Sequence, residues 1–234
     1  MITFDPSARW TCACCSCREI PRSRAAAVNC DRTVCFANLH LSMSVPSFTL
    51  DGILPPFTGD PTDGATMSPF KVTVLEFVAS FALTRQRVQI LESFLEFRRR
   101  IHELGITRGV QWIDGSFVEM NDAIRAPRDV DIVTFFFRPA SMADRRAWEA
   151  AIDAHPDVFE HGQVKTDLRC DSYWVDLSVP APLYHVDQTR YWFGIFSHRR
   201  ATQQWKGMLE LPLGSLAEDH EAANLLRSHD DPED

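Results

Sequence analysis

The sequence predicts an α/β fold, in the broad sense that includes α+β, with a mixed central sheet flanked by helices. Two segments, 110–114 and 131–137, are rich in β-branched and aromatic residues and predict strands. Residues 85–104 carry an apolar stripe at helical spacing and predict a helix. With 234 residues, of which 45% are hydrophobic, the chain is long enough to bury one sizeable core.

The helix expected at 85–104 has the clearest pattern of the chain. A helical pattern begins near residue 71, and its best-defined apolar face consists of Ile90, Phe94, Phe97, Ile101 and Leu104. Gly105 follows at the place where a glycine commonly ends a helix. The arginines at 98–100 stand near this end, where cations interact favourably with the helix dipole. We therefore interpret them as a solvated helix end rather than as a nucleic-acid patch.

The two expected strands frame the stretch that carries the chemistry. The first leads into a turn at Gly115 and Ser116, and Asp129 and Asp131 stand at the start of the second. Side chains two apart on a strand point to the same face, so the two carboxylates lie together. Like charges held side by side favour a counter-cation, and hard oxygen ligands suit Mg²⁺. A glycine lets backbone N–H groups approach an anion, so the turn predicts a phosphate-binding nest.

This pattern resembles the signature of the DNA polymerase β-type nucleotidyltransferase superfamily. The signature pairs a Gly-Ser turn with an Asp-x-Asp strand, here Gly115-Ser116 and Asp129-Val130-Asp131-Ile132. The residue before the glycine is usually apolar in that signature, whereas here it is Asp114. The runs 112–117 and 191–194 also resemble an uncharacterised bacterial family of small stand-alone nucleotidyltransferase-like proteins. That resemblance covers residues 43–213.

A third acid is expected on a strand at 173–179. In the resembled superfamily, the third catalytic carboxylate lies on a strand next to the Asp-x-Asp strand. Asp176 stands in the middle of the apolar run, where an acid is costly to bury without a partner. Asp167 and Asp171 are rivals that precede the run, in a segment typical of a loop. We expect Asp176 to be the third catalytic acid and metal ligand.

Two groups of residues are candidates for contacts with a nucleotide. Arg125 and Arg128 lie in the loop 118–128, and a guanidinium pairs well with phosphate, although simple solvent exposure is the alternative. The second group is aromatic and basic: Tyr184, His185, Tyr191, Trp192, Phe193, Phe196, His198, Arg199, Arg200, Trp205 and Lys206. It either stacks a base and touches phosphates, or covers the sheet with its cations in solvent. Both alternatives stay open.

The remaining elements follow from capping and breaking signals. A helix is expected at 141–154, opened by Ser141 and burying Trp148 and Ile152. A final strand is expected at 205–211 because apolar and polar residues alternate there. A capping box at Ser215 and Glu218 then predicts a last helix to about Arg227, and residues 230–234 form an acidic tail that is expected to be disordered.

The first 42 residues differ from the rest because they hold six of the seven cysteines: Cys12, Cys14, Cys15, Cys17, Cys30 and Cys35. A zinc-binding head is one interpretation, but the spacing lacks two matched Cys-x₂₋₄-Cys pairs. A misassigned start is favoured instead, since Met43 is a natural initiation point, and a docking tail is the third possibility. The working domain is therefore expected at 43–229.

Charge and hydropathy limit the partners. Lys and Arg total 24 against 32 Asp and Glu, for a net charge of −8, which disfavours a long nucleic acid as partner. Only three of the 24 basic residues are lysines, a bias that suggests a GC-rich bacterial genome. No apolar run reaches the length of a transmembrane helix, about 18 residues, and no signal peptide is visible, so we expect a cytoplasmic protein that does not enter a membrane.

The resemblance implies a metal-dependent nucleotidyltransferase that uses ATP or another nucleoside triphosphate. Asp129, Asp131 and Asp176 would hold two Mg²⁺ ions, with Mn²⁺ as a substitute, while Gly115 and Ser116 cradle the triphosphate. The acceptor is a protein hydroxyl, an RNA end or a small molecule. A toxin–antitoxin or phage-defence setting, with an antitoxin-like partner protein, is a further expectation from the superfamily. The alternatives are a catalytically inactive nucleotidyltransferase-fold binding module and a metal-dependent phosphodiesterase or nuclease.

Overall fold

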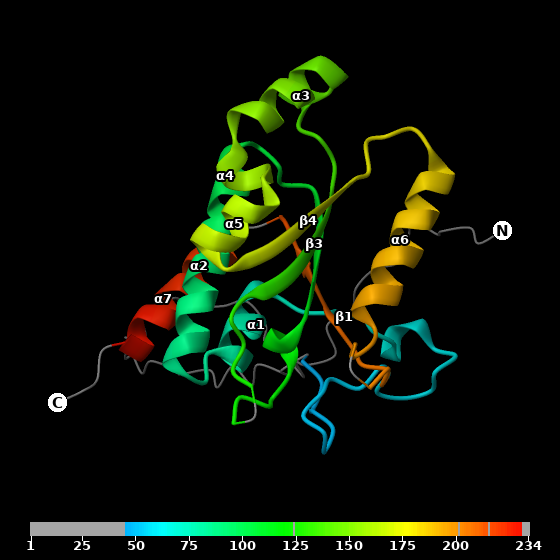
Figure 1. Ribbon diagram of the computed structural model, residues 1–234, viewed down its shortest axis with the longest axis vertical. Helices are drawn as coiled ribbons and strands as arrows, with labels where there is room; N and C mark the ends of the chain where they lie inside the picture. The colour runs from blue at the N-terminus through cyan, green and yellow to red at the C-terminus, as the bar shows by residue number, and fades with distance from the viewer. Residues whose placement is uncertain (1–44, 124, 201, 215, 231–234) are drawn as a thin grey trace, which may run out of the picture. The chain divides into compact units, whose positions relative to one another are not determined.

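The computed structural model describes residues 45–123, 125–200, 202–214 and 216–230, and the fold is that of these residues (Figure 1). The Cys-rich extension expected at 1–42 lies outside them, so the zinc, misassigned-start and docking-tail interpretations stay predictions. Of the acidic tail expected at 230–234, the structure describes only Asp230, which is the last residue of a helix.

Five strands form one mixed sheet at the centre of the described domain. In chain order they are β1 (Phe70–Lys71), β2 (Gly109–Asp114), β3 (Val130–Phe136), β4 (Cys170–Asp176) and β5 (Leu209–Pro212). Across the sheet their order is β1-β5-β2-β3-β4. β1 is parallel to β5 and β3 is parallel to β4, whereas β2 is antiparallel to both of its neighbours. The predicted mixed sheet is therefore confirmed.

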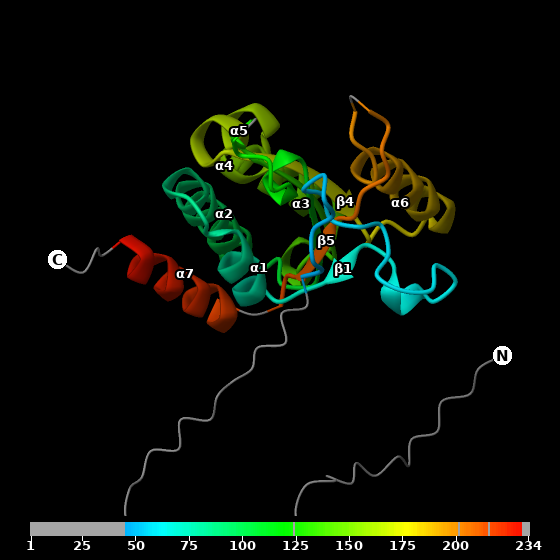
Figure 2. The same ribbon diagram turned by 90° about the horizontal axis from the view of Figure 1, so that it is seen from below.

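Helices cover both faces of this sheet (Figures 1 and 2). One face carries α1 (Val74–Phe81), α2 (Arg85–Glu103), α3 (Arg145–Ala154), α4 (Pro156–Phe159), α5 (His161–Leu168) and α7 (Leu216–Asp230). The opposite face carries α6 (Pro182–Phe196), whose Trp192 and Phe196 pack into a cluster with Phe135 and Val175 of the sheet. The α/β class with a sheet flanked by helices is confirmed.

The predicted helix at 85–104 corresponds to α2. The Thr84 side chain accepts a hydrogen bond from the Arg87 N–H and caps the first turn. Four residues of the predicted apolar stripe, Ile90, Phe94, Phe97 and Ile101, are buried in the larger core, as expected from their spacing, and Leu104 at the end of the helix is partly buried. The helical pattern that begins near residue 71 is, however, two helices, because the chain leaves helical geometry between Phe81 and Thr84.

The interpretation of residues 98–100 as a solvated helix end is wrong for Arg98. This side chain is fully buried, and its Nε and Nη2 bind both carboxylate oxygens of Asp219 on α7 at 2.9 and 3.0 Å. Its Nη1 also donates to the Gln111 side chain of β2 at 2.6 Å. Arg98 therefore ties α2 to both α7 and the sheet, whereas Arg99 stays half exposed and pairs with Glu96 on its own helix.

Strand register brings the predicted site residue Asp131 to one end of the sheet, together with Asp114 and Asp171. On β2 and β3, Asp114 lies opposite Asp131, and on β3 and β4, Asp131 lies beside Asp171. Directly paired residues project from the same face of a sheet, so these three carboxylates form a row across three strands. This end is where β2 finishes and where the parallel strands β3 and β4 begin. All three of these acids line one pocket, so this pocket lies at the ends of the strands rather than over a face of the sheet.

Several boundaries differ from the predicted ones. The strand expected at 173–179 is β4, which begins three residues earlier and ends at Asp176, where that side chain accepts a hydrogen bond from the Ser178 N–H and turns the chain. The helix expected at 141–154 begins at Arg145, because Asp144 rather than Ser141 caps it. Trp148 is buried as predicted, but Ile152 is exposed.

Three helices were not predicted, and the ends of the last strand and the last helix also differ from the predicted ones. Neither α4 nor α5 was expected, and the aromatic and basic segment at 184–206 contains most of α6. The last strand is shorter than 205–211 and shifted towards the C-terminus, and the last helix extends to Asp230 rather than Arg227. Within the described part of the chain, no helix has the length and apolar character needed to cross a membrane.

Candidate active site

The turn after β2 requires a glycine. Gly115 has a φ of +81°, a backbone conformation that L-residues with side chains rarely adopt. A Cβ atom at this position would lie 1.7 Å from Oδ2 of Asp131. The Asp131 carboxylate therefore rests directly against the Gly115 backbone, and the next residue, Ser116, lines the pocket.

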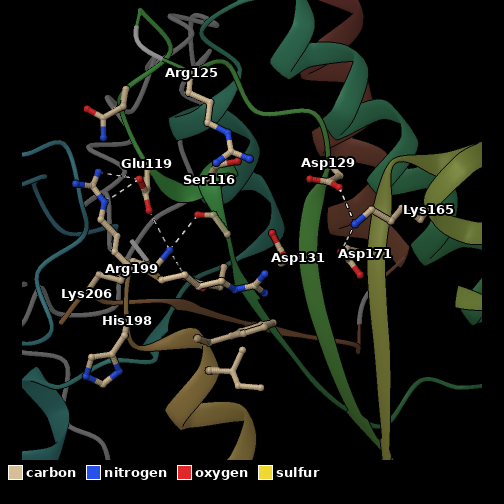
Figure 3. A pocket seen from close by; sticks show the side chains of 16 residues that line it. Ser116, Glu119, Arg125, Asp129, Asp131, Lys165, Asp171, His198, Arg199 and Lys206 are labelled. Carbon is tan, nitrogen blue, oxygen red and sulfur yellow. Dashed lines mark hydrogen bonds and ion pairs between the residues drawn. The ribbon is translucent and has the colours of Figure 1, made fainter. Parts of the chain in front are cut away.

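Three aspartates line one wall of a pocket of about 400 Å³ (Figure 3). Asp131 lies on β3, Asp129 immediately precedes that strand, and Asp171 is the register partner of Asp131 on the parallel strand β4. Gly115 and Ser116 line the same pocket. The structure thus brings together the predicted turn and the predicted Asp-x-Asp pair.

Asp131 bears the least compensated charge of the three. Among the described residues it has no ion-pair partner, although its neighbours Asp129 and Asp171 both have one. Burial, followed by repulsion from Asp171 and Asp129, raises the pKa of Asp131 to about 6. A carboxylate that repels its neighbours in this way favours the binding of a cation beside it.

Asp176 does not lie at this site, so its predicted placement beside the Asp-x-Asp pair is wrong. It is the last residue of β4, it pairs in register with Phe136, and its carboxylate binds Arg138 Nε at 2.5 Å. Odd and even residues of a strand face opposite sides, so Asp176 also projects from the other face than Asp171. Asp171, the rival, occupies the position next to Asp131.

Lys165 of α5 lies between two of the three carboxylates (Figure 3). Its Nζ is 3.1 Å from Asp129 Oδ2 and donates a hydrogen bond to Asp171 Oδ2. Partial burial works to lower the pKa of Lys165, but the bonds to Asp171 and Asp129 outweigh it and raise that pKa above its usual value. The ammonium is therefore charged and acts as the counter-ion of this pair.

The other wall of the pocket contains a second lysine with two acids. Lys206 is buried, and its Nζ lies 3.0 Å from Asp114 Oδ1 and 3.1 Å from Glu119 Oε1, while it also donates to the Gly115 carbonyl at 3.1 Å. Burial raises the pKa of Asp114 to about 7, against the opposing charge of Lys206. Asp114, the departure from the resembled signature, thus joins a network that holds the Gly-Ser turn.

Glu119 connects this network to a cation after α6. Its Oε2 accepts hydrogen bonds from Arg199 Nη2 at 2.7 Å and from Arg199 Nε at 3.1 Å. Burial works to raise the pKa of Glu119, yet the bonds from Arg199 and Lys206 together hold it below its ordinary value. Glu119 is therefore an ionised anchor for two cations on the same side of the pocket (Figure 3).

The two arginines predicted to contact phosphate differ in position. Arg125 lines the pocket, whereas Arg128 is exposed and is not among the lining residues. Arg200 is exposed and also lines the pocket. Within the described ranges, neither the Arg125 nor the Arg200 guanidinium has a side-chain partner, so both are free to meet an anion. The pocket thus has an acidic wall at the strand ends and a basic wall opposite.

The aromatic and basic residues of 184–206 were expected either to contact a nucleotide or to cover the sheet, and the structure divides them between these two positions. Trp192 and Phe196 pack on the sheet, which agrees with the covering role. The last basic residues, His198 to Arg200 together with Lys206, line the pocket instead. The signal missed in the sequence is the scarcity of lysine: two of only three lysines in the chain, Lys165 and Lys206, lie at this site.

The carboxylates fit a cation in chemistry but are not gathered around a common point. Carboxylate oxygens are the ligands that Mg²⁺ prefers, and Asp131 lacks a cationic partner in the described structure. No three His, Cys, Asp or Glu side chains of the described residues converge in the manner of a metal centre. Asp129 and Asp171 turn towards Lys165 instead. The donor set therefore fits a divalent ion next to Asp131.

Fold and site together define an α/β protein with a mixed, helix-flanked sheet and a charged pocket at the ends of its central strands. The chain belongs to the DUF6932 family, a family of unknown function, whose model matches residues 46–212. The matched range contains every residue of the pocket. No curated protein and no solved structure matches the chain.

Proposed function

We propose that this protein is a metal-dependent nucleotidyltransferase. It would transfer a nucleoside monophosphate from a nucleoside triphosphate to an acceptor hydroxyl and release pyrophosphate. The observation that carries the proposal is the row of Asp131 and Asp171 on adjacent parallel strands, with Asp129 beside them and the strained Gly115 turn packed on Asp131. This is the arrangement that the resemblance to DNA polymerase β-type nucleotidyltransferases implies, with Asp171 in place of Asp176.

The two walls of the pocket suit the two ends of a metal–triphosphate complex. Asp129 and Asp131 would hold a divalent ion, which neutralises the triphosphate charge that develops during transfer. Arg125 and Arg200 are free to bind phosphate oxygens, because a guanidinium presents paired N–H donors to an oxyanion. Ser116, which lines the pocket, would lie against the phosphates. The site therefore orients the triphosphate between acids and arginines.

The reaction needs little covalent help from the protein. The acceptor oxygen forms a bond to the α-phosphorus while the bond from that phosphorus to the bridging oxygen of pyrophosphate breaks, and the hydroxyl proton is lost to solvent. Catalysis then comes mainly from positioning and charge stabilisation. The acceptor remains a protein hydroxyl, an RNA end or a small molecule, and a toxin–antitoxin or phage-defence role with an antitoxin-like partner is part of the same proposal.

Calorimetric titration with the four ribonucleoside triphosphates, with and without Mg²⁺, tests the site. We expect one triphosphate to bind only with metal, and the double variant Asp129→Ala, Asp131→Ala to lose that binding. Asp176→Asn is the matched control, because it removes an aspartate of the same sheet outside the pocket and should bind like the wild type. Absence of metal-dependent binding in the folded wild type would contradict the proposal.

A catalytically inactive nucleotidyltransferase-fold binding module is the second candidate. The observation that favours it is the Lys165 bridge, because an ammonium takes up two of the three carboxylates. Pyrophosphate release separates the two candidates. The enzyme releases pyrophosphate when triphosphate, metal and a cell extract that supplies the acceptor are combined, and the Asp129→Ala, Asp131→Ala variant does not. The binding module would bind the triphosphate without releasing pyrophosphate.

A further inference from the structure

Lysine is used sparingly in this chain and is concentrated in the pocket. Of 24 basic residues, only Lys71, Lys165 and Lys206 are lysines, and the last two line the pocket. Each of these two ammonium groups lies between two carboxylates. An ammonium is a compact point charge, whereas a guanidinium is a planar fork. At both places the chain thus uses the side chain that most resembles a bound metal ion.

The Lys165 ammonium lies between two carboxylates, as a bound metal ion would. It reaches Asp129 at 3.1 Å and hydrogen-bonds to Asp171, the two acids on either side of Asp131 (Figure 3). Asp171 is buried, and its Oδ1 receives no hydrogen bond from the described residues. The His161 ring lies beside that oxygen, with its Nε2 3.4 Å away. Lys165 is therefore the lysine that balances the charge of this carboxylate within the described residues.

The charges at the wall of three aspartates determine how many further cations it accommodates in the substrate-free protein. Asp129, Asp131 and Asp171 carry three formal negative charges when ionised, and Lys165 supplies one positive charge. The other two acids that line the pocket, Asp114 and Glu119, are matched by Lys206 and Arg199, which leaves Arg125 and Arg200 for the phosphates. One divalent ion completes the balance. A second divalent ion would have to displace the ammonium from the two oxygens that it contacts, or sit beside it at the cost of like-charge repulsion.

We propose that the Lys165 ammonium occupies one of the two cation positions of this site, so that the protein binds a single divalent ion, held by Asp129 and Asp131. This inference rests on the proposed function and refines it. The resembled superfamily implies two Mg²⁺ ions among three carboxylates, whereas here the position between Asp129 and Asp171 is filled by a side chain of the protein itself. Lys165 is then a positioning residue that replaces an ion.

Counting bound Mn²⁺ tests the proposal directly. The full chain is titrated with Mn²⁺, the free ion is measured by its electron paramagnetic resonance signal, and the count is made with and without a non-hydrolysable triphosphate. We expect one ion per chain for the wild type and two for Lys165→Met, which vacates the position but keeps a similar side-chain length. Lys71→Met is the matched control, since it removes an exposed lysine away from the pocket, and it should bind one ion.

The outcomes separate this inference from the proposed function. Two ions in the wild type, or equal counts in the wild type and Lys165→Met, would overturn the role of Lys165 and leave the nucleotidyltransferase proposal standing. No bound ion in any of the proteins would overturn both. Circular dichroism establishes that each variant is folded, and if Lys165→Met is not, the neutral but polar Lys165→Gln takes its place with the same expected count of two.

Discussion

At the scale of single residues, Asp131 combines the strongest functional expectation with a cost to stability. Its pKa is raised to about 6 by burial and by Asp171 and Asp129, so at pH 8 the folded protein holds an unfavourable charge. We expect Asp131→Asn to raise the free energy of unfolding of the metal-free protein at pH 8 by roughly 1 to 3 kcal/mol. The gain should shrink as the pH falls from about 6 towards the unfolded value near 3.8, because folded Asp131 then binds a proton.

Urea denaturation of wild type and variant at pH 8 and at pH 5 measures this difference. Asp176→Asn is the control, because it removes a carboxylate that is satisfied by Arg138 and by the Ser178 N–H. That control should lower the free energy of unfolding. If Asp131→Asn were also destabilising at pH 8, the picture of an uncompensated carboxylate would be wrong.

Gly115 is the second residue whose replacement has a defined consequence. A methyl group there would meet Asp131 Oδ2 at 1.7 Å, on a backbone with φ of +81°, so either the turn or the carboxylate must move. We expect Gly115→Ala to weaken metal-dependent triphosphate binding at least tenfold and to lower stability by about 1 to 3 kcal/mol. Calorimetry and thermal unfolding measure the two effects. Gly64→Ala, with open space around its Cβ position, should change neither.

Residues of the site were predictable where one short stretch of chain determines their position. Gly115 with Ser116, and Asp129 with Asp131, follow from turn chemistry and from the two-residue period of a strand. The choice between Asp171 and Asp176 depends on the register of β4 against β3, which no local pattern contains. Lys165 lies on a helix that the sequence did not predict, so its contact with Asp129 required the tertiary structure.

At the scale of elements, α2 fixes the loop that follows the Gly-Ser turn. Arg87 is fully buried, its Nε and Nη2 bind Asp122 at 2.7 and 2.6 Å, and it also donates to the carbonyls of Phe117 and Glu119 at 2.6 Å each. We expect Arg87→Met to lower the free energy of unfolding by about 2 to 4 kcal/mol, because a partly buried acid and two carbonyls lose their partner. Chemical denaturation gives the value.

Arg85→Met serves as the comparison for Arg87→Met, since Arg85 is exposed on the first turn of the same helix. It should change stability by less than about 0.5 kcal/mol. The Arg87→Met protein should also bind the triphosphate more weakly. Arg87 holds the backbone of Glu119, whose carboxylate binds Arg199 and Lys206 on the basic wall of the pocket. Equal stability of the two variants would show that Arg87 does not hold this loop.

The elements that the sequence predicted are those with a clear period. β2, β3 and α2 have apolar patterns that match their final burial. By contrast, α6 buries Trp192 and Phe196 but exposes Leu183, Val186 and Tyr191, so no clean stripe marks it as a helix. The first residues of β4 were not predicted as strand because Asp171 and Ser172 are polar, and yet both are buried.

At the scale of the whole molecule, most of the described core lies within the part of the chain that matches the family. The core includes Val45 and Phe48 at its margin and extends to Leu226 on α7, whereas the match covers residues 46–212. The pocket lies entirely within this range. Fold and site therefore belong to one described domain, and its expected start at Met43 stays a prediction.

Removal of residues 1–42 tests this assignment. We expect a chain of residues 43–234 to unfold within about 2 °C of the full chain and to bind the same metal–triphosphate complex with the same affinity, because every contact described for the core and the pocket lies within 45–230. Differential scanning calorimetry and isothermal titration measure both quantities. The full chain treated with a zinc chelator is the matched control. A shorter chain that unfolds at a clearly lower temperature, together with an equal decrease in the chelated full chain, would instead assign the six N-terminal cysteines to a zinc site that supports the domain.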